Sequence, residues 1–271
     1  MNEKRRPERD QRPRRADRFA DRTAVEEVEG QLEGRNALQE ALKSGRTIDK
    51  VFIASGDVDR SLQRLAAEAQ QAGAVVVPVD RRKLDAMSTT RAHQGIIALV
   101  AAHTYCTIDE ILEEAANRGE APLIVVCDEL SDPHNLGAIL RSAECAGAHG
   151  VIIPKRRAVG LTATVAKASA GAIEYMKVAR VTNVSNALKE LKDKGVWVFG
   201  TAAEGSIPMY KADLRGPAAI VIGNEGDGIS QLVRKNCDVM VNIPMKGNIS
   251  SLNASAAASI LLYEAVRQRL E

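Results

Sequence analysis

The chain has 271 residues, enough for one large or two modest folded domains, and 45% of them are hydrophobic. Only 3% are aromatic, which limits any nucleic-acid binding built on stacked rings because few rings are available. The net charge of +2 is uneven, because the first 22 residues carry nine Lys and Arg against five Asp and Glu, and the rest carries 28 against 30. The folded part is therefore not broadly basic, and any contact with a polyanion must use a local patch or the N-terminal segment.

Several classes of protein do not fit the sequence. No apolar run approaches the roughly 18 residues of a membrane span, and no apolar segment follows the charged N-terminus as it would in a secretory signal. The cysteines are widely spaced and form no C-x-x-C pair, which favours free thiols over a disulfide framework or a zinc site. We expect a cytoplasmic protein that carries no metal. The cysteines are Cys106, Cys127, Cys145 and Cys237.

The N-terminal part divides into a tail and a small α/β unit. Residues 1–27 are rich in Arg, Asp, Glu and Pro, so we expect a disordered basic tail that acts as a solubilising segment or as a cationic arm on RNA. Residues 28–103 form the small unit, in which helices alternate with apolar strands. Its predicted elements are the helices Arg35–Lys43, Asp59–Gln71 and Arg81–Met87 and the strands Lys50–Ala54, Ala74–Val79 and Gly95–Ala101.

The rest of the chain has a different pattern of predicted elements. Residues 104–121 are expected to be a linker with one helix, Ile108–Asn117, and residues 122–271 a larger domain that ends in a long helix, Leu252–Leu270. Its strands are nearly continuous Val and Ile runs separated by helical segments, which is typical of a parallel sheet covered on both faces. These strands are Leu123–Cys127, Gly150–Ile153, Tyr175–Val181, Val196–Thr201, Ala218–Ile222 and Val239–Ile243.

A glycine cluster, Gly223-Asn224-Glu225-Gly226-Asp227-Gly228, directly follows one of these strands. Parallel sheets bind ligands at the carboxyl ends of their strands, so the cluster is a candidate site. Its G-x-x-G-x-G order differs from the dinucleotide fingerprint, and no Gly-Lys-Ser/Thr follows as in a phosphate-binding loop. A tight turn that needs positive φ explains the cluster equally well.

Two further polar segments also follow apolar strands. In Asp132-Pro133-His134-Asn135-Leu136-Gly137-Ala138-Ile139-Leu140-Arg141-Ser142-Ala143, the proline fits the start of a helix. The second runs from Ile243 to Ser255, through a loop of small polar residues to the start of the last helix. Capping alone is sufficient to explain its Ser251 and Asn253.

Together and in this order, the segments "DPHNLGAILRSA", "IVIGNEGDGIS" and "IPMKGNISSLNASAAASILLYEA" resemble the three motifs of the SpoU (TrmH-like) branch of the SPOUT methyltransferases. The segment from "EGRNALQEAL" to "HQGIIALV" resembles the L30e-like substrate-binding domain attached to many members. The combination is similar to the RlmB-like subgroup, which methylates the ribose 2′-hydroxyl of a guanosine in 23S ribosomal RNA.

The resemblance implies an α/β fold in which the C-terminal parallel sheet contains a deep trefoil knot, an exception to the rule that chains avoid knots. It also implies a homodimer that acts on ribosomal RNA or the assembling large subunit, with S-adenosyl-L-methionine as cofactor. Gly223 would let backbone approach the cofactor, and Ile243 and Leu252 would flank its adenine. The positions expected to bind the cofactor are Gly200, Thr201, Gly223, Asn224, Gly226, Ile243, Met245 and Leu252.

The positions that match the family's catalytic residues are Asn135, Arg141, Glu225, Ser251 and Asn253. A guanidinium keeps its proton, so we interpret Arg141 as a cationic clamp on the developing alkoxide rather than a general base. Glu225 would orient Arg141, and the base stays unassigned. His93, His103 and His149 are expected to be structural. RNA contacts are expected at Arg35, Asn36, Lys43, Arg46, Arg91, Gln94 and His134.

Three alternatives stay open at this point. One is the same chemistry on transfer RNA or on an antibiotic-target site in ribosomal RNA. Another is a non-catalytic RNA-binding factor in ribosome assembly, against which the full set of catalytic positions argues. A nucleotide-dependent oxidoreductase is disfavoured by the glycine order.

Overall fold

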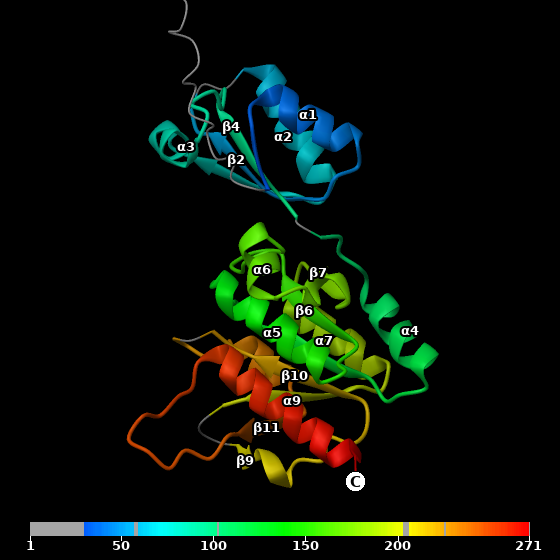
Figure 1. Cartoon of the computed structure of the whole chain (residues 1–271). Helices are drawn as coiled ribbons and strands as arrows, with labels where there is room; N and C mark the ends of the chain where they lie inside the picture. The colour runs from blue at the N-terminus through cyan, green and yellow to red at the C-terminus, as the bar shows by residue number, and fades with distance from the viewer. Residues whose placement is uncertain (1–29, 57–58, 102, 203–205, 225, 271) are drawn as a thin grey trace, which may run out of the picture.

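A computed structural model describes residues 30–56, 59–101, 103–202, 206–224 and 226–270, and the predicted basic tail lies outside these ranges. An N-terminal four-stranded sheet and a C-terminal seven-stranded sheet form two domains that follow one another along the chain (Figure 1). None of the helices within these ranges is long and apolar enough to cross a membrane.

In the N-terminal domain, the strand order is β1-β4-β2-β3, and only β2 and β3 run parallel. Helices α1 and α2 cover one face of this sheet and α3 covers the other. The sequence predicts α1 and α3 with their observed bounds but does not predict β1, a three-residue edge strand. The elements are β1 (Gln31–Glu33), α1 (Arg35–Lys43), β2 (Ile48–Ala54), α2 (Arg60–Gln71), β3 (Val75–Val79), α3 (Arg81–Met87) and β4 (Ile96–Val100).

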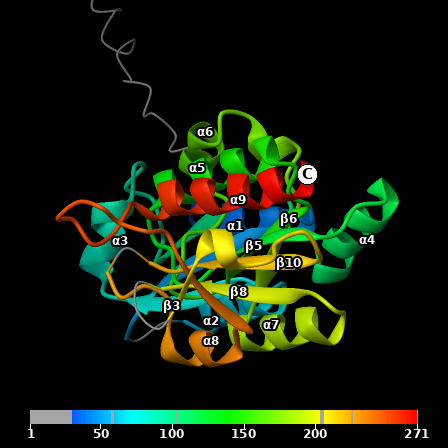
Figure 2. The ribbon, with the colours of Figure 1, turned by 90° about the horizontal axis from the view of Figure 1, so that it is seen from below.

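The segment between the two sheets packs on the C-terminal domain. Helix α4 (Ile108–Arg118) begins with a complete capping box between Thr107 and Glu110. Its Ile111 is fully buried among side chains of the larger sheet, and Cys106 pairs with the edge strand as an isolated bridge. Although we expect 104–121 to be a linker, α4 therefore also covers part of the sheet (Figure 2).

The C-terminal domain alternates strands and helices as predicted, except that the short strand β9 and a 3₁₀ helix replace an α-helix between β8 and β10. Parallel pairing unites all its strands in the order β7-β6-β5-β10-β8-β11-β9. The elements are β5 (Leu123–Cys127), α5 (Pro133–Cys145), β6 (Gly150–Pro154), α6 (Ala163–Ala168), the 3₁₀ helix η1 (Ala172–Glu174), β7 (Val178–Val181), α7 (Val184–Asp193), β8 (Trp197–Thr201), β9 (Ile207–Pro208), the 3₁₀ helix η2 (Met209–Lys211), β10 (Ala218–Ile222), α8 (Gln231–Asn236), β11 (Val239–Asn242) and α9 (Ala254–Leu270).

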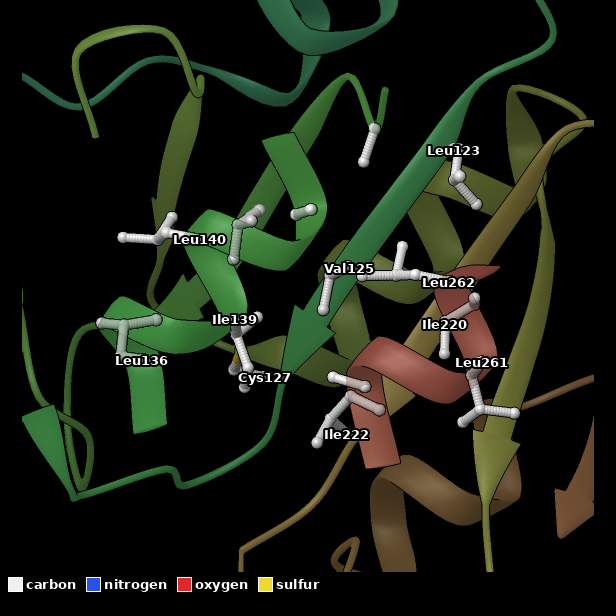
Figure 3. Close-up of a cluster of buried hydrophobic side chains, with 14 of the residues drawn as sticks. Leu123, Val125, Cys127, Leu136, Ile139, Leu140, Ile220, Ile222, Leu261 and Leu262 are labelled. Carbon is white, nitrogen blue, oxygen red and sulfur yellow. The ribbon is translucent and has the colours of Figure 1, made fainter. Parts of the chain in front are cut away.

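Strand β10 lies between β5 and β8, although it follows both in the chain. Its alternate residues face opposite layers: Ile220 and Ile222 point to α5 and α9, and Val221 points to the layer of α7 and α8. Figure 2 shows these two helical layers on either side of the sheet. Figure 3 shows the first layer, where α5 and α9 side chains meet those of β5 and β10. The parallel sheet covered on both faces is thus confirmed, and the trefoil knot stays a prediction.

Two predicted elements start two or more residues later than the sequence suggests. Strand β7 begins at Val178 rather than Tyr175, because η1 occupies the preceding residues and Tyr175 is 78% exposed. Helix α9 begins at Ala254 rather than Leu252, because the Asn253 side chain accepts hydrogen bonds from the backbone N–H groups of Ser255 and Ala256. In both cases, a local polar or turn contact delays the start of the regular element beyond the start of the apolar pattern.

A buried charge cluster joins the two domains. Asp49 of β2 receives hydrogen bonds from the Tyr105 hydroxyl, at 2.7 Å, and from the Arg180 guanidinium of β7. The Arg180 guanidinium also stacks 4.5 Å from the centre of the Tyr105 ring and donates to the backbone carbonyl of Gly73 in the N-terminal domain. The side chains of Asp49 and Arg180 are each 8% exposed. An unpaired buried charge is costly, so the carboxylate from the N-terminal domain and the guanidinium from the C-terminal domain each stabilise the other in its buried position.

Within the N-terminal domain, Glu33 of β1 fixes the turn at residues 88–90. Its carboxylate accepts hydrogen bonds from the Ser88 hydroxyl and from the backbone N–H groups of Thr89 and Thr90. Burial alone would raise the pKa of Glu33, but the hydrogen bonds from Ser88, Thr90 and Thr89 outweigh it and hold the pKa well below its usual range.

A depressed folded-state pKa stabilises the fold above the unfolded-state value of about 4.3, and the contribution is lost as the pH falls below it. We therefore expect Glu33→Gln to lower the free energy of unfolding by about 2 kcal/mol at pH 7 and by progressively less below pH ~4. Urea titrations between pH 3 and 8 would measure the difference in free energy of unfolding between wild type and variant at each pH. Glu40→Gln, which alters only an exposed pair with Lys43, is the control and should cost less than about 0.5 kcal/mol. If the loss of unfolding free energy in Glu33→Gln did not change with pH, the hydrogen-bonded carboxylate would not be its cause.

Candidate functional site

The loops after four neighbouring strands meet at the carboxyl edge of the C-terminal sheet. Strands β5, β10, β8 and β11 are consecutive in the sheet and parallel, so the residues that directly follow them, Asp128, Gly223, Ala202 and Ile243, emerge side by side. Hydrogen bonds tie them in pairs. The backbone N–H of Asp128 donates to Ile222 at 2.8 Å, and the Asn242 amide donates to the Ser206 hydroxyl at 2.9 Å. All three motif segments of the sequence converge here.

The glycine loop is closed on itself. Asn224 and Gly228 exchange backbone hydrogen bonds of 3.1 and 3.2 Å, and the Asn224 side-chain oxygen accepts from the N–H groups of Gly226 and Asp227. A Cβ at Gly223 would lie 2.0 Å from the carbonyl carbon of Gly228, so no other residue fits there. Among the described residues of this loop, positive φ is found at Gly228 only, and a Cβ at Gly226 would meet nothing closer than 3.6 Å. Thus close backbone approach, more than a left-handed turn, explains the first glycine.

A residue that the sequence reasoning missed holds this loop in place. Asp128, 3% exposed, follows β5, and its carboxylate accepts a 2.7 Å hydrogen bond from the backbone N–H of Ser230. It therefore links the loop after β5 to the end of the glycine loop. An acidic residue immediately after a fully buried strand is a signal that could have identified it.

The first and third motifs meet through two asparagines. Asp132 caps α5, and Pro133 occupies its first turn. Asn135 therefore lies in the first turn of the helix, where its side chain is buried, with an exposed fraction of 6%. The Asn253 amide donates a 2.8 Å hydrogen bond to the Asn135 side-chain oxygen. Asn253 also caps α9, so the same side chain both starts that helix and contacts Asn135.

The other expected catalytic residues are not joined to this pair. Arg141 lies six residues beyond Asn135 on α5, about 9 Å along the axis, and its side chain is exposed. Ser251 is exposed in the loop before α9, and Glu225 lies outside the described residues. The structure thus brings Asn135 and Asn253 together and leaves Arg141 and Ser251 open to solvent.

The expected cofactor positions divide into apolar and packing residues. Ile243 packs partly against the core, while Met245 and Leu252 are 38% and 40% exposed beside it in the 243–253 loop. An aliphatic surface of this kind, next to loop backbone, suits an adenine ring with polar edges. Gly200 serves packing, since a Cβ there would lie 2.6 Å from the Cys237 sulfur, and the Thr201 hydroxyl donates to the Val221 carbonyl.

The expected RNA-binding residues lie in three separate places. Gln94 and Arg91 lie in the loop after α3, and the Gln94 side chain accepts from the backbone N–H of Arg35, which places Arg35 and Asn36 beside them. The Arg35 guanidinium is bound by Asp59. Exposed Lys43 and Arg46 lie at the far end of α1, and His134 is exposed at the start of α5.

Buried thiols and histidines offer no alternative chemistry. Burial raises the pKa of Cys127 and of Cys237 to about 12, so both stay protonated near neutral pH. Burial also lowers the pKa of His149, whose Nδ1 accepts from the backbone N–H of Leu123. His93 is bound in the same way to the N–H of Gly95 and to Asp85. These contacts support structural roles for both histidines.

A surface cavity between the start of β5 and the end of α9 includes none of the expected site residues, and it lies at the opposite edge of the sheet.

Comparison with known proteins accounts for the arrangement at the carboxyl edge. Residues 122–263 match the model of the SpoU rRNA Methylase family, and residues 31–106 match that of the RNA 2′-O ribose methyltransferase substrate-binding domain. The chain belongs to the SpoU rRNA methylase family. A Bacillus subtilis protein assigned to the TrmH family of tRNA/rRNA methyltransferases is 48% identical over 236 residues, which cover 87% of this chain and 94% of the relative.

Solved structures agree with the family. The SpoU methyltransferase AviRb from Streptomyces viridochromogenes, in complex with AdoMet, superposes with a TM-score of 0.57 at 26% identity, covering 89% of this chain and 90% of that one. A structure described as an RNA 2′-O ribose methyltransferase gives 0.51 at 28% identity, covering 89% of each chain. The protein is therefore an S-adenosylmethionine-dependent RNA 2′-O-methyltransferase of the TrmH type, and S-adenosylmethionine is its expected cofactor.

If the glycine loop binds the cofactor, the close approach between Gly223 and the backbone of Gly228 must be essential for that binding. We expect Gly223→Ala to weaken S-adenosylmethionine binding at least tenfold in calorimetric titration, because the added Cβ would overlap the Gly228 backbone. Gly226→Ala has room for its Cβ and should bind within about twofold of wild type. Unaltered binding by Gly223→Ala, with the fold intact by circular dichroism, would exclude the loop from the cradle.

Proposed function

We propose that the protein methylates the ribose 2′-hydroxyl of a guanosine in 23S ribosomal RNA. The observation that carries the proposal is the contact between Asn135 and Asn253, which joins the first and third motifs beside the glycine loop. A polar pair at the start of two helices, next to an apolar cofactor surface, suits a ribose that must lie against a methyl donor.

The chemical difficulty is the nucleophile. A ribose hydroxyl is a poor nucleophile near neutral pH, so the site has to align it and stabilise the negative charge that develops on its oxygen. Bound S-adenosylmethionine supplies an electrophilic sulfonium methyl. Ile243, Leu252 and the backbone of the glycine loop would hold it, while this chain's polar side chains act on the RNA.

Among these side chains, Asn135 and Asn253 position the ribose through their amides. Arg141 clamps the developing alkoxide and the adjacent phosphate, since a guanidinium cannot accept the proton. Its exposed position, without a carboxylate partner among the residues that the structure describes, leaves it available to RNA. Glu225 orients Arg141, and Ser251 adds a hydroxyl to the polar side chains around the ribose.

The N-terminal domain favours a large, structured substrate, because it adds a second surface, built on a separate sheet, to the catalytic edge (Figure 1). The group Arg35, Asn36, Arg91 and Gln94 forms its RNA contact. We further propose a homodimer, with the catalytic edge near the subunit interface.

The clamp can be separated from a general base by two substitutions. Arg141→Ala should lower the single-turnover methylation rate at least 100-fold, roughly the value of one lost transition-state donor. Arg141→Lys keeps the charge and should recover part of that loss, because a lysine can still neutralise an alkoxide. Rates for Arg141→Ala within a few fold of wild type would remove Arg141 from the mechanism.

The substrate itself can be tested directly. Incubation with labelled S-adenosylmethionine and total ribosomal and transfer RNA from a strain that lacks the gene should label 23S RNA at one mapped 2′-O-methylguanosine. Label in transfer RNA, or at a different nucleoside, would replace the proposed substrate. No label in either pool, with cofactor binding demonstrated, would favour a non-catalytic assembly factor.

A further inference from the structure

A basic loop lies beside the site and is used by none of the motifs. Residues Lys155, Arg156 and Arg157 follow β6 at the carboxyl edge of the sheet. Because β6 is the parallel neighbour of β5, this loop emerges next to the loop that leads to Asn135. Three consecutive cations therefore stand at the rim of the proposed active site.

The loop is fixed to the segment after β5 that leads to the first motif. The Arg157 guanidinium pairs with Glu129 at 2.9 Å, and the backbone N–H of Val159 donates to the Leu130 carbonyl at 2.9 Å. Arg157 and Glu129 both adopt left-handed backbone conformations, with φ of 56° and 58°. Non-glycine residues hold such conformations only where surrounding contacts impose them, so the two loops form one rigid unit.

The same loop is also anchored at the domain junction. Just beyond the basic residues, Leu161 donates its N–H to the Tyr105 hydroxyl at 2.9 Å, and Gly160 lies against the buried carboxylate of Asp49. Lys155 approaches the other domain, since its ammonium is 4.0 Å from the Cβ position of Gly73. The cations are thus held between the substrate-binding domain and the catalytic edge.

Two of these three cations, Lys155 and Arg156, have charges that no carboxylate of the described residues balances. In the ranges that the structure describes, neither Lys155 nor Arg156 has a carboxylate partner, and Arg156 is exposed. Adjacent like charges on a fixed loop repel one another, and a bound polyanion would relieve that repulsion. RNA phosphates fit better than an acidic protein surface, because the proposed substrate has to pass this rim to reach Asn135.

We propose that Lys155 and Arg156 bind the phosphate backbone of the RNA between the part held by the N-terminal domain and the target ribose. The proposal rests on the proposed function for its choice of partner. Such contacts carry no sequence information, but they set the register in which a distant binding surface presents one ribose to the site.

The test compares two double variants. Lys155→Ala/Arg156→Ala removes the proposed contacts and leaves the Arg157–Glu129 pair intact. Lys189→Ala/Lys235→Ala serves as the control, because it removes two exposed cations from α7 and α8, on the face of the sheet opposite to α5 and α9 (Figure 2). A fluorescein-labelled RNA hairpin of about 24 nucleotides is the probe, and its Kd is measured from about 50 to about 300 mM KCl, a range over which phosphate contacts change affinity strongly.

For Lys155→Ala/Arg156→Ala, we expect roughly tenfold weaker binding at about 150 mM KCl and a slope of log K against log salt that is smaller by about 1.5, as for two lost phosphate contacts. S-adenosylmethionine affinity should stay within twofold of wild type, and the control should match wild type in both RNA measurements. A Kd and slope equal to those of the control would overturn the proposal and leave an acidic protein surface as the partner.

The hairpin measurement does not depend on methyl transfer. If wild type methylated no RNA at all, the proposed function would fail while the binding comparison would still decide the role of the loop. If wild type methylated 23S RNA and the two double variants bound the hairpin equally, only the role of the loop would fail.

Discussion

The position of β10 between β5 and β8 is the constraint on which the site depends. Parallel pairing on both sides of β10 places its carboxyl end, and therefore Gly223, between the loop that leads to Asn135 and the loops after β8 and β11. The backbone bond from Asp128 to Ile222 and the bond from Ser230 to Asp128 then lock the neighbouring loops. Without this insertion, the three motifs would lie on separate parts of the sheet edge. Local loop geometry is thus a consequence of strand order.

Much of the fold follows from the sequence, and the reasons are local. Strands β5 and β10 are unbroken apolar runs that each follow a proline and end before Asp128 and Gly223, so their bounds are predicted correctly, as are those of α1 and α3. The predictions fail where side-chain or turn contacts override the apolar pattern, as at Tyr175 and Asn253. Short elements such as β1, α6, α8 and β9 carry too few residues for a periodic signal.

Some residues of the site can likewise be identified from the sequence, whereas others become apparent only from the fold. The motif resemblance identifies Asn135 and Asn253, which are 118 residues apart, but their hydrogen bond exists only because α5 and α9 pack on one face of the sheet. The role of Asp128 and the placement of Lys155 beside the first motif depend on which strands are neighbours, and the sequence pattern alone does not determine that order. Gly200 illustrates the converse, because its small size serves packing around Cys237 rather than a ligand.

The buried pair of Asp49 and Arg180 also bears on how RNA specificity can change in this architecture. A chimera that exchanged only the substrate-binding domain for that of a relative without an acid at this position would leave Arg180 charged and unpaired beneath Tyr105. The cost of about 3–5 kcal/mol for a stranded buried charge is a large part of a typical domain's stability. Domain grafting here therefore has to transfer the carboxylate together with the new RNA-binding surface, or replace the arginine with an apolar residue.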